Sequence, residues 1–345
     1  MNTRTLGTDF EVSAVGLGCM GFSHAYGAPM VETETIQMLR YACELGYTFF
    51  DTAEIYGTPD DPNANERVAG EALQPIRNHV KIASKFGIRF DYDSPQVNKP
   101  LIPDSRPEVI RASVEGSLKR LRTDHIDLYY QHRMDPAVEP ETVAEVMAEL
   151  IKEGKVLHWG ISEADENYLR RAHAVCPVTA VQNRYSMMAR QHEALFPVLE
   201  ELKIGFVAFS PMANGFLTGK YGKDAHFDKK YDYRSNMPQF TPEAVEQNRE
   251  LLTMLHEIAG EHRASPAQIS MAWMLCKKPW IVPIPGTRKP ERLRENAGAA
   301  GIYLSPEEVA DLDDLLDQIP MSAVFGGSSM KTGSGQREDR FAASR

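Results

Sequence analysis

Four side chains suited to proton transfer stand at or near the ends of short apolar runs in this sequence. Asp51, Lys85 and His132 each follow such a run closely, and Tyr56 lies five residues beyond Asp51. Parallel strands of a barrel gather their carboxyl ends at one mouth. If the runs are such strands, an acid, a phenol, an amine and an imidazole surround one site.

These four groups together suit the reduction of a carbonyl. Hydride addition to a carbonyl carbon makes an alkoxide, which needs a proton, and we assign Tyr56 as its donor. A phenol with a pKa near about 10 is a poor acid at neutral pH. Lys85 would favour its ionised form and Asp51 would anchor Lys85. His132 would orient the substrate by a hydrogen bond to its carbonyl oxygen.

Each of the four residues also has an ordinary structural interpretation. Asp51 could cap a helix, and Tyr56 could be a surface aromatic residue. Lys85 could be a solvated lysine at a strand end, and His132 could be a buried histidine whose ring nitrogens are hydrogen-bonded. Taken singly, those interpretations are the more frequent ones. Their joint occurrence on successive strand ends favours a catalytic site.

Strand-like and helical segments alternate along the whole chain. Helical stripes occupy Thr33–Leu45 and Glu141–Glu153, each followed by glycine, and proline opens helices at Pro107 and Pro290. Eight such units predict an α/β fold of the (β/α)8-barrel type, with its site at the carboxyl ends of the strands. The predicted strands are Val12–Gly18, Tyr47–Phe50, Val80–Ala83, Ile126–Tyr130, Val156–Ile161, Val178–Gln182, Ile204–Phe209 and Trp280–Ile284.

The length predicts one domain with long loops. The chain has 345 residues, whereas a typical barrel needs about 250. We expect a single domain over residues 1–345 with a core at about 6–317. The surplus is assigned to loops at Phe86–Ser105 and Ser210–Thr241, and to a flexible tail or lid edge over 318–345.

A glycine motif near the N-terminus offers a competing interpretation. Gly16, Gly18 and Gly21 match the dinucleotide fingerprint of an open Rossmann sheet. That fingerprint requires a helix at its third glycine, and the following residues, with Gly27 and Pro29, carry no helical stripe. We therefore interpret the segment as a loop that leaves the first strand, with a simple tight turn as the alternative.

Composition limits the partners and the cell compartment. The net charge of −10 disfavours nucleic acid and anionic membranes. Four scattered cysteines and no signal sequence or apolar span predict a cytoplasmic protein with reduced thiols. The histidines form no metal motif, so no metal site is expected. A homo-oligomer is compatible with the sequence, but nothing in it indicates one.

One segment is basic within this acidic chain and predicts the cofactor. It follows the eighth predicted strand and enters a helix at Pro290, where a helix N-terminus favours phosphate. Arg288 and Arg292 lie about one turn apart and could hold a 2′-phosphate, which favours NADPH over NADH. The alternative is a solvated basic helix face.

Motifs over nearly the whole chain, from Leu6 to about Asp317, resemble the aldo-keto reductase superfamily, in particular its larger bacterial and plant reductases. They include FFDTAEIYG, KIASKFG, LYYQH, KEGKVLHWGIS, PVTAVQNRYS and VPIPGTRKPERLRENAGA. The resemblance implies that Asp51, Tyr56, Lys85 and His132 are the catalytic tetrad. It also implies NADPH/NADP as cofactor and a small carbonyl substrate. The cofactor residues that we assign are Gly18, Met20, Gly21, Asp51, Ser162, Gln182, Phe209, Ser210, Pro211, Met212, Gly286, Thr287, Arg288, Arg292, Glu295 and Asn296.

Within that set the resemblance gives separate roles. Ser162 and Gln182 would hold the nicotinamide carboxamide, and Phe209 would stack on its ring. The segment from Gly286 to Asn296 would hold the adenosine end. Two residues depart from the family pattern. Many members carry asparagine at the position of Glu163 and often tyrosine at the position of Phe209. These departures affect the expected substrate rather than the reaction.

Two functions fit this resemblance. The first is NADPH-dependent reduction of aldehydes or ketones. The second is a regulatory subunit that senses NADP(H), as in the potassium-channel β subunits, which keep similar residues. Turnover of simple aldehydes would separate them.

Overall fold

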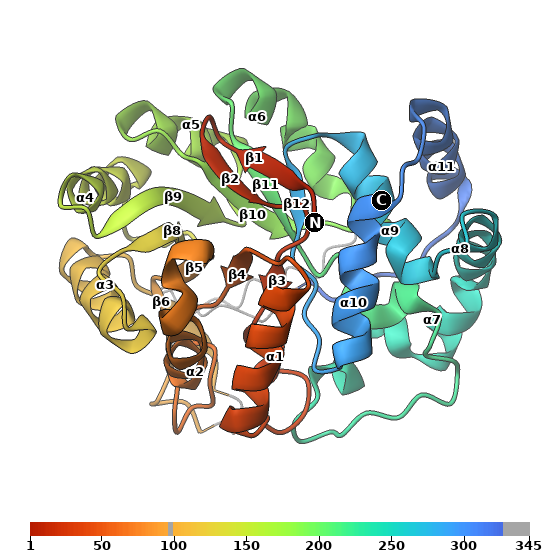
Figure 1. The fold of residues 1–345 in the computed structure, drawn as a ribbon, viewed down its shortest axis with the longest axis horizontal. Helices are drawn as coiled ribbons and strands as arrows, with labels where there is room; N and C mark the ends of the chain where they lie inside the picture. Colours follow the sequence, from red (N-terminus) through yellow and green to blue (C-terminus); the bar gives the residue numbers. More distant parts are fainter. Residues whose placement is uncertain (96–98, 327–345) are drawn as a thin grey trace.

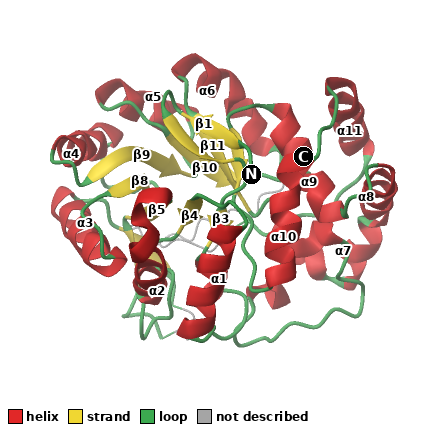
Figure 2. Ribbon diagram, in the orientation of Figure 1, coloured by secondary structure: helices red, strands yellow, loops and turns green. Residues whose placement is uncertain are grey.

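Eight parallel strands curl into a barrel and helices surround it in the computed structural model (Figures 1 and 2). The structure describes residues 1–95 and 99–326. Neighbouring barrel strands pair in chain order. The strands are β3 (Leu17–Gly18), β4 (Phe49–Asp51), β5 (Lys81–Phe86), β8 (Ile126–Gln131), β9 (Val156–Ser162), β10 (Ala180–Arg184), β11 (Gly205–Phe209) and β12 (Ile281–Pro283).

Backbone hydrogen bonds between the first and last strands close the barrel. Gly16 N donates to Pro283 O at 2.9 Å, and Gly18 N donates to Pro285 O at 3.3 Å. The predicted barrel fold is thereby confirmed. The Rossmann interpretation is wrong, since the sheet is closed and a short 3-10 helix (Met20–Phe22) follows β3 instead of a long helix.

Helices cover the outside of the barrel, as Figure 2 shows in red. Gly46 and Gly154 follow α1 and α4 with φ of 88° and 74°, the left-handed backbone that ends a helix. The helices are α1 (Glu32–Glu44), α2 (Ala64–Leu73), α3 (Pro107–Leu121), α4 (Pro140–Lys152), α5 (Glu166–Val175), α6 (Phe196–Leu202), α7 (Pro242–Gln247), α8 (Arg249–Glu261), α9 (Pro266–Lys277), α10 (Pro290–Gly298) and α11 (Pro306–Gln318).

An N-terminal hairpin differs from the sequence prediction. Strands β1 (Thr3–Leu6) and β2 (Phe10–Ser13) pair antiparallel, so the predicted first strand, Val12–Gly18, is split between the hairpin and β3. Leu6, Phe10 and Val12 pack with inward-facing barrel residues such as Val207. Leu6 also lies against Gly205, the first residue of β11, so the hairpin closes the amino-terminal end of the barrel.

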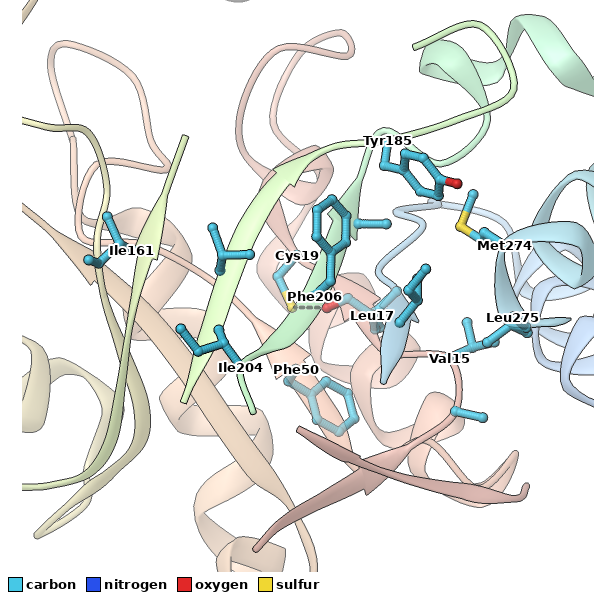
Figure 3. Close-up of a cluster of buried hydrophobic side chains, with 14 of the residues drawn as sticks. Val15, Leu17, Cys19, Phe50, Ile161, Tyr185, Ile204, Phe206, Met274 and Leu275 are labelled. Atoms are coloured by element: carbon cyan, nitrogen blue, oxygen red, sulfur yellow. Dashed lines mark hydrogen bonds between the residues drawn. The ribbon is translucent and has the colours of Figure 1, made fainter. Parts of the chain in front are cut away.

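A second, larger apolar layer lies between strands and helices. Figure 3 shows part of it, with Phe50, Ile161 and Phe206 from strands and Met274 from α9. Burial of these side chains on both faces of the strands explains their continuous apolar sequence. It also fixes which residues stand at the strand ends, where the polar side chains lie.

Two of the predicted loops contain regular structure. Within Phe86–Ser105, strands β6 (Ile88–Phe90) and β7 (Leu101–Pro103) form an antiparallel ribbon. Within Ser210–Thr241, three short 3-10 helices occur. The start of the predicted tail is held to the barrel, because Ser322 N and Phe325 N donate to the Asn248 and Gln239 side chains at 2.9 and 3.0 Å. Residues 327–345 of that tail lie outside the described residues.

The remaining features of the fold concern the cysteines and the membrane. All four cysteines are free thiols. Within the described part of the chain, no helix combines the length and apolarity needed to cross a bilayer. The cytoplasmic location stays a prediction.

Candidate active site

The four residues predicted to be catalytic meet at the carboxyl ends of β4, β5 and β8. Lys85 Nζ forms an ion pair with Asp51 Oδ1 and donates to the Thr52 carbonyl at 2.8 Å. The same Nζ lies 4.7 Å from the centre of the Tyr56 ring. The Tyr56 and His132 rings pack edge to face with centres 5.6 Å apart. A phenol therefore stands between an ammonium and an imidazole.

Asp51 is held by two donors from different strands. Its Oδ1 accepts from Lys85, and its Oδ2 accepts from Gln182 Nε2 at 2.7 Å. Both carboxylate oxygens thus act as acceptors, which suits the ionised form. Burial raises the pKa of Asp51, while Lys85 and Gln182 oppose that effect.

Lys85 is completely buried and stays charged. Burial lowers the pKa of its ammonium, but Asp51 and Tyr56 together outweigh burial and raise that pKa above its ordinary value. Uncharged lysine would leave the buried Asp51 carboxylate without a counter-charge. The ion pair therefore fixes one positive charge beside the phenol.

Burial, more than charge, governs the acidity of Tyr56. Burial raises the pKa of the phenol, Lys85 lowers it and Asp51 raises it, and the net direction is upward. Lys85 acts in the direction that the sequence argument expected, but its effect is smaller than that of burial. The phenol therefore keeps its proton at neutral pH.

His132 is neutral in this site. Burial first, and then Arg133, Lys85 and His24, hold the pKa of its imidazole well below the ordinary value. Its Nδ1 is buried from solvent and makes no hydrogen bond to any described residue. A buried N–H without an acceptor is rare in proteins, so we place the proton on Nε2, which can then donate to a ligand.

A cleft of about 440 Å³ is lined by Asp51, Tyr56 and His132, whereas the buried Lys85 does not line it. Every cofactor residue expected from the sequence lines it except Glu295, which forms an ion pair with Arg292 instead. Phe209 ends β11 on one wall, and Gly286 follows β12 on another. The cleft therefore joins the catalytic residues to the basic segment that follows the eighth barrel strand.

The glycines of the cleft allow two chain segments to approach. A Cβ atom on Gly18 would stand 2.7 Å from Ile284 O, and one on Gly286 would stand 2.8 Å from Gly18 O. Any side chain at either position would force the loops after β3 and β12 apart. This close approach explains Gly18 better than the dinucleotide fingerprint does.

The two predicted phosphate-binding arginines have different surroundings. Arg288 donates to the carbonyls of Gly21, Gly27 and Ala28, so its guanidinium holds the loop after β3. Arg292 is part-exposed, lines the cleft and pairs with Glu295. Arg292 therefore has more guanidinium donors left for a ligand than Arg288 has.

Three arginines that line the cleft were not predicted from the sequence, namely Arg133, Arg184 and Arg234. Arg133 directly follows His132, and Arg184 lies two residues after Gln182 on β10. Alternate residues of a strand share one face, so the two-residue spacing from Gln182 could have identified Arg184. Arg133 has no comparable signal, because it lies beyond the end of β8.

The apolar wall of the cleft was missed as well. The ribbon residues Ile88 and Phe90 cluster with Ile55 and contact Tyr56. Phe325, from the start of the tail, lines the cleft too. Their contribution depends on how loops fold back over the barrel, which periodicity does not reveal.

A closed parallel barrel with this cluster at its carboxyl mouth defines a (β/α)8-barrel enzyme. The model of the aldo/keto reductase family matches residues 14–317. The chain therefore belongs to the aldo/keto reductase family and is an oxidoreductase acting on CH–OH groups.

Individual relatives agree with this assignment. The chain is 39% identical over 325 residues to "Probable aldo-keto reductase 1" of Glycine max, covering 93% of this chain and 90% of that protein. Its structure is similar to that of the glycerol dehydrogenase AKR11B4 from Gluconobacter oxydans, with a TM-score of 0.82, 27% identity and coverage of 94% and 98%. The fold of aldo-keto reductase AKR11C1 from Bacillus halodurans is also similar, with a TM-score of 0.73, 24% identity and the same coverage.

Proposed function

We propose that this protein reduces aldehydes or ketones to alcohols with NADPH, and that Tyr56 donates the proton. The observation that carries the proposal is the position of the Tyr56 phenol, set between the Lys85 ammonium and the His132 imidazole. A small carbonyl compound in the cleft would meet both hydrogen-bond donors.

The residues present fit the nicotinamide cofactor. Asn296 Nδ2 is buried against the cleft and makes no hydrogen bond to any described residue, as expected of a group that awaits a ligand. Ser162 Oγ accepts from Arg133 at 3.0 Å, which leaves its proton for a carboxamide oxygen. Gln182 uses its Nε2 on Asp51, which leaves its Oε1 to accept from a carboxamide NH₂.

The chain's residues supply positioning and the proton, and the bound cofactor supplies the hydride. His132 Nε2 would donate to the carbonyl oxygen and orient it. As charge develops on that oxygen, the Tyr56 proton transfers to it, and the phenolate is stabilised by Lys85. Asp51 keeps Lys85 in place, and solvent returns the proton to Tyr56 after the alcohol leaves.

NADPH is the preferred cofactor in this proposal because cations gather at the adenosine end. Arg292 and Lys289 line the cleft next to the N-terminus of α10, where a helix favours a phosphate. Arg288 contributes by holding the loop after β3 rather than by an open guanidinium.

Titration with NADPH and NADH, followed by addition of 4-nitrobenzaldehyde while the cofactor absorbance is followed, tests the proposal. We expect tighter binding of NADPH and its oxidation on addition of the aldehyde. Tight binding with no turnover across a panel of aldehydes would favour the NADP(H)-sensing subunit, and binding of neither cofactor would refute both.

A further inference from the structure

Seven cationic side chains but a single acid, Asp51, line the described cleft of this acidic protein. Most of the cations have partners or lie at the rim. Arg234 pairs with Asp232, Arg292 with Glu295, and Arg288 with loop carbonyls. Lys220 and Lys289 are exposed. The two remaining cations are Arg133 and Arg184.

Arg184 is buried without a polar partner. It is 7% exposed, and its guanidinium makes no hydrogen bond or ion pair to any described residue; its recorded contact is with the Phe209 ring, 5.3 Å from the ring centre. Burial lowers the pKa of its guanidinium, Glu163 raises it and Arg133 lowers it again, and the net direction is downward. An arginine stays charged in proteins, so a buried positive charge stands here without a hydrogen-bonded or ion-paired partner.

Arg133 lies next to the reacting groups and is only partly satisfied. One nitrogen of its guanidinium donates to the His132 carbonyl at 2.6 Å and to Ser162 Oγ at 3.0 Å. Its Nε and second terminal nitrogen have no partner among residues 1–95 and 99–326. Its charge is close enough to affect the pKa values of Tyr56 and His132.

One acid, Glu163, acts on the charge of Arg184 but forms no ion pair with either guanidinium group. Glu163, at φ of 60°, accepts from the Arg184 backbone N at 3.0 Å, and it does not line the cleft. Strand β9 lies between β8 and β10 in the sheet, so the two arginines flank its end. Two like charges that act on each other thus line the same cleft as the phenol that would protonate the substrate.

We propose that Arg133 and Arg184 bind an anionic oxygen group, a carboxylate or a phosphate ester, on the carbonyl substrate. The inference rests on the proposed reductase function and narrows its substrate to anionic aldehydes or ketones. Guanidinium groups match such oxyanions with paired hydrogen bonds. An anion placed there compensates both charges, while the apolar wall of Ile55, Ile88 and Phe90 covers the rest of the substrate.

The pair 4-carboxybenzaldehyde and 4-nitrobenzaldehyde tests this inference, because the two substituents have the same shape but differ in charge. We expect a higher kcat/KM for the carboxylate, and a loss of that preference by at least about tenfold in Arg184→Gln, which corresponds to about 1.4 kcal/mol. Arg184→Lys should retain part of the preference. Arg40→Gln, which removes an exposed charge on α1, should retain all of it.

Cofactor binding separates the alternatives. If Arg184→Gln weakens NADPH binding and lowers both rates equally, Arg184 serves the cofactor and the inference fails. It also fails if the wild-type protein shows no preference for the charged aldehyde over the neutral one and, in parallel, none for glyceraldehyde 3-phosphate over glyceraldehyde. A preference for the charged aldehyde in the benzaldehyde pair alone identifies the anion as a carboxylate. A preference in the glyceraldehyde pair alone identifies it as a phosphate ester.

A binding measurement keeps the inference testable without turnover. Calorimetry would compare 4-(hydroxymethyl)benzoate with 4-nitrobenzyl alcohol on the complex with NADP. Tighter binding of the carboxylate that is lost in Arg184→Gln or Arg133→Gln supports the anion site even if the proposed reduction fails. Equal binding of both alcohols to the wild-type complex refutes the site.

Discussion

Gln182 Nε2 donates to Asp51 Oδ2 at 2.7 Å, which joins two residues that lie 131 positions apart in the chain. The bond crosses the barrel mouth from β10 to β4 and holds the carboxylate that pairs with Lys85. Gln182 therefore does more than the sequence resemblance implied. It positions the ion pair and keeps its amide oxygen for a ligand.

Asp51→Asn should lower both activity and stability. The substitution leaves the buried Lys85 ammonium without its counter-charge, which costs about 3 kcal/mol of unfolding free energy. The ammonium would also lose its fixed place beside Tyr56, so kcat should fall by about 100-fold. Urea unfolding and steady-state kinetics measure the two effects. Wild-type values for both would show that Asp51 does not anchor Lys85.

Tyr56→Phe should abolish reduction and keep cofactor binding. The substitution removes one hydroxyl from the cleft, and general acid catalysis contributes a factor of about 10² to 10⁴. NADPH affinity, measured by fluorescence titration, should stay within about twofold, because the phenol is not assigned to the cofactor. A variant that reduces aldehydes at the normal rate would remove Tyr56 from the mechanism.

The groups that could be predicted from sequence are those fixed by strand ends. Asp51, Lys85 and His132 follow apolar runs, and the burial of those runs dictates where each strand stops. Contacts between distant loops could not be predicted. The donation from Arg288 to the loop after β3 depends on how that loop crosses the cleft, which no periodicity encodes.

The hairpin shows the same limit at the other end of the barrel. Val12 and Leu17 read as one strand because both are apolar and close in sequence. The chain turns between them, so that Val12 covers the barrel floor and Leu17 joins the wall. Likewise the pKa of Tyr56 is raised mainly because the phenol is buried, and the depth of burial could not be predicted from the sequence.

The pH profile of reduction should stay flat through the ordinary range of histidine. His132 has a depressed pKa, so it remains neutral as the pH falls through 6.5. Tyr56 has a raised pKa, so its proton is lost only above the ordinary range of tyrosine, near 10. The log of kcat/KM for 4-nitrobenzaldehyde should therefore show no break between pH 6 and 9. A break near 6.5 that disappears in His132→Gln would contradict the neutral imidazole.

Glu54 should make stability depend on pH. Burial, and then Glu66, raise the pKa of its carboxyl from the ordinary value of 4.5 to about 7. The protonated form is favoured in the folded state, so its contribution is fully present below pH 4.5 and is lost as the pH rises through about 7. Glu54→Gln should remove this pH dependence. In the wild-type protein it amounts to roughly 2 kcal/mol of unfolding free energy, after allowance for the partial exposure of Glu54.

Urea unfolding at pH 5 and pH 8 would measure that effect. Glu44→Gln, an exposed substitution on α1, is the matched control and should leave the dependence unchanged. The same pH dependence in wild type and Glu54→Gln would show that Glu54 is already ionised in the folded protein at pH 5.

Arg292→Ala should discriminate between the two cofactors. Its part-exposed guanidinium lines the cleft beside α10, where we place the 2′-phosphate. Loss of a charged hydrogen bond to that phosphate should weaken NADPH binding about tenfold and leave NADH binding nearly unchanged. Equal losses for both cofactors would show that Arg292 does not contact the 2′-phosphate.

Arg288→Ala should weaken both cofactors alike, in contrast to Arg292→Ala. Arg288 donates to the carbonyls of Gly21, Gly27 and Ala28, so its removal should free the loop after β3, which lines the cleft. The freed loop should raise the dissociation rates of NADPH and NADH by a similar factor. In this proposal Arg288 holds the loop and does not bind the 2′-phosphate, so its loss should affect the cofactor with that phosphate and the cofactor without it alike. Stopped-flow fluorescence measures both rates. A selective effect on NADPH would mean that Arg288 leaves the loop when the cofactor binds and takes the phosphate itself.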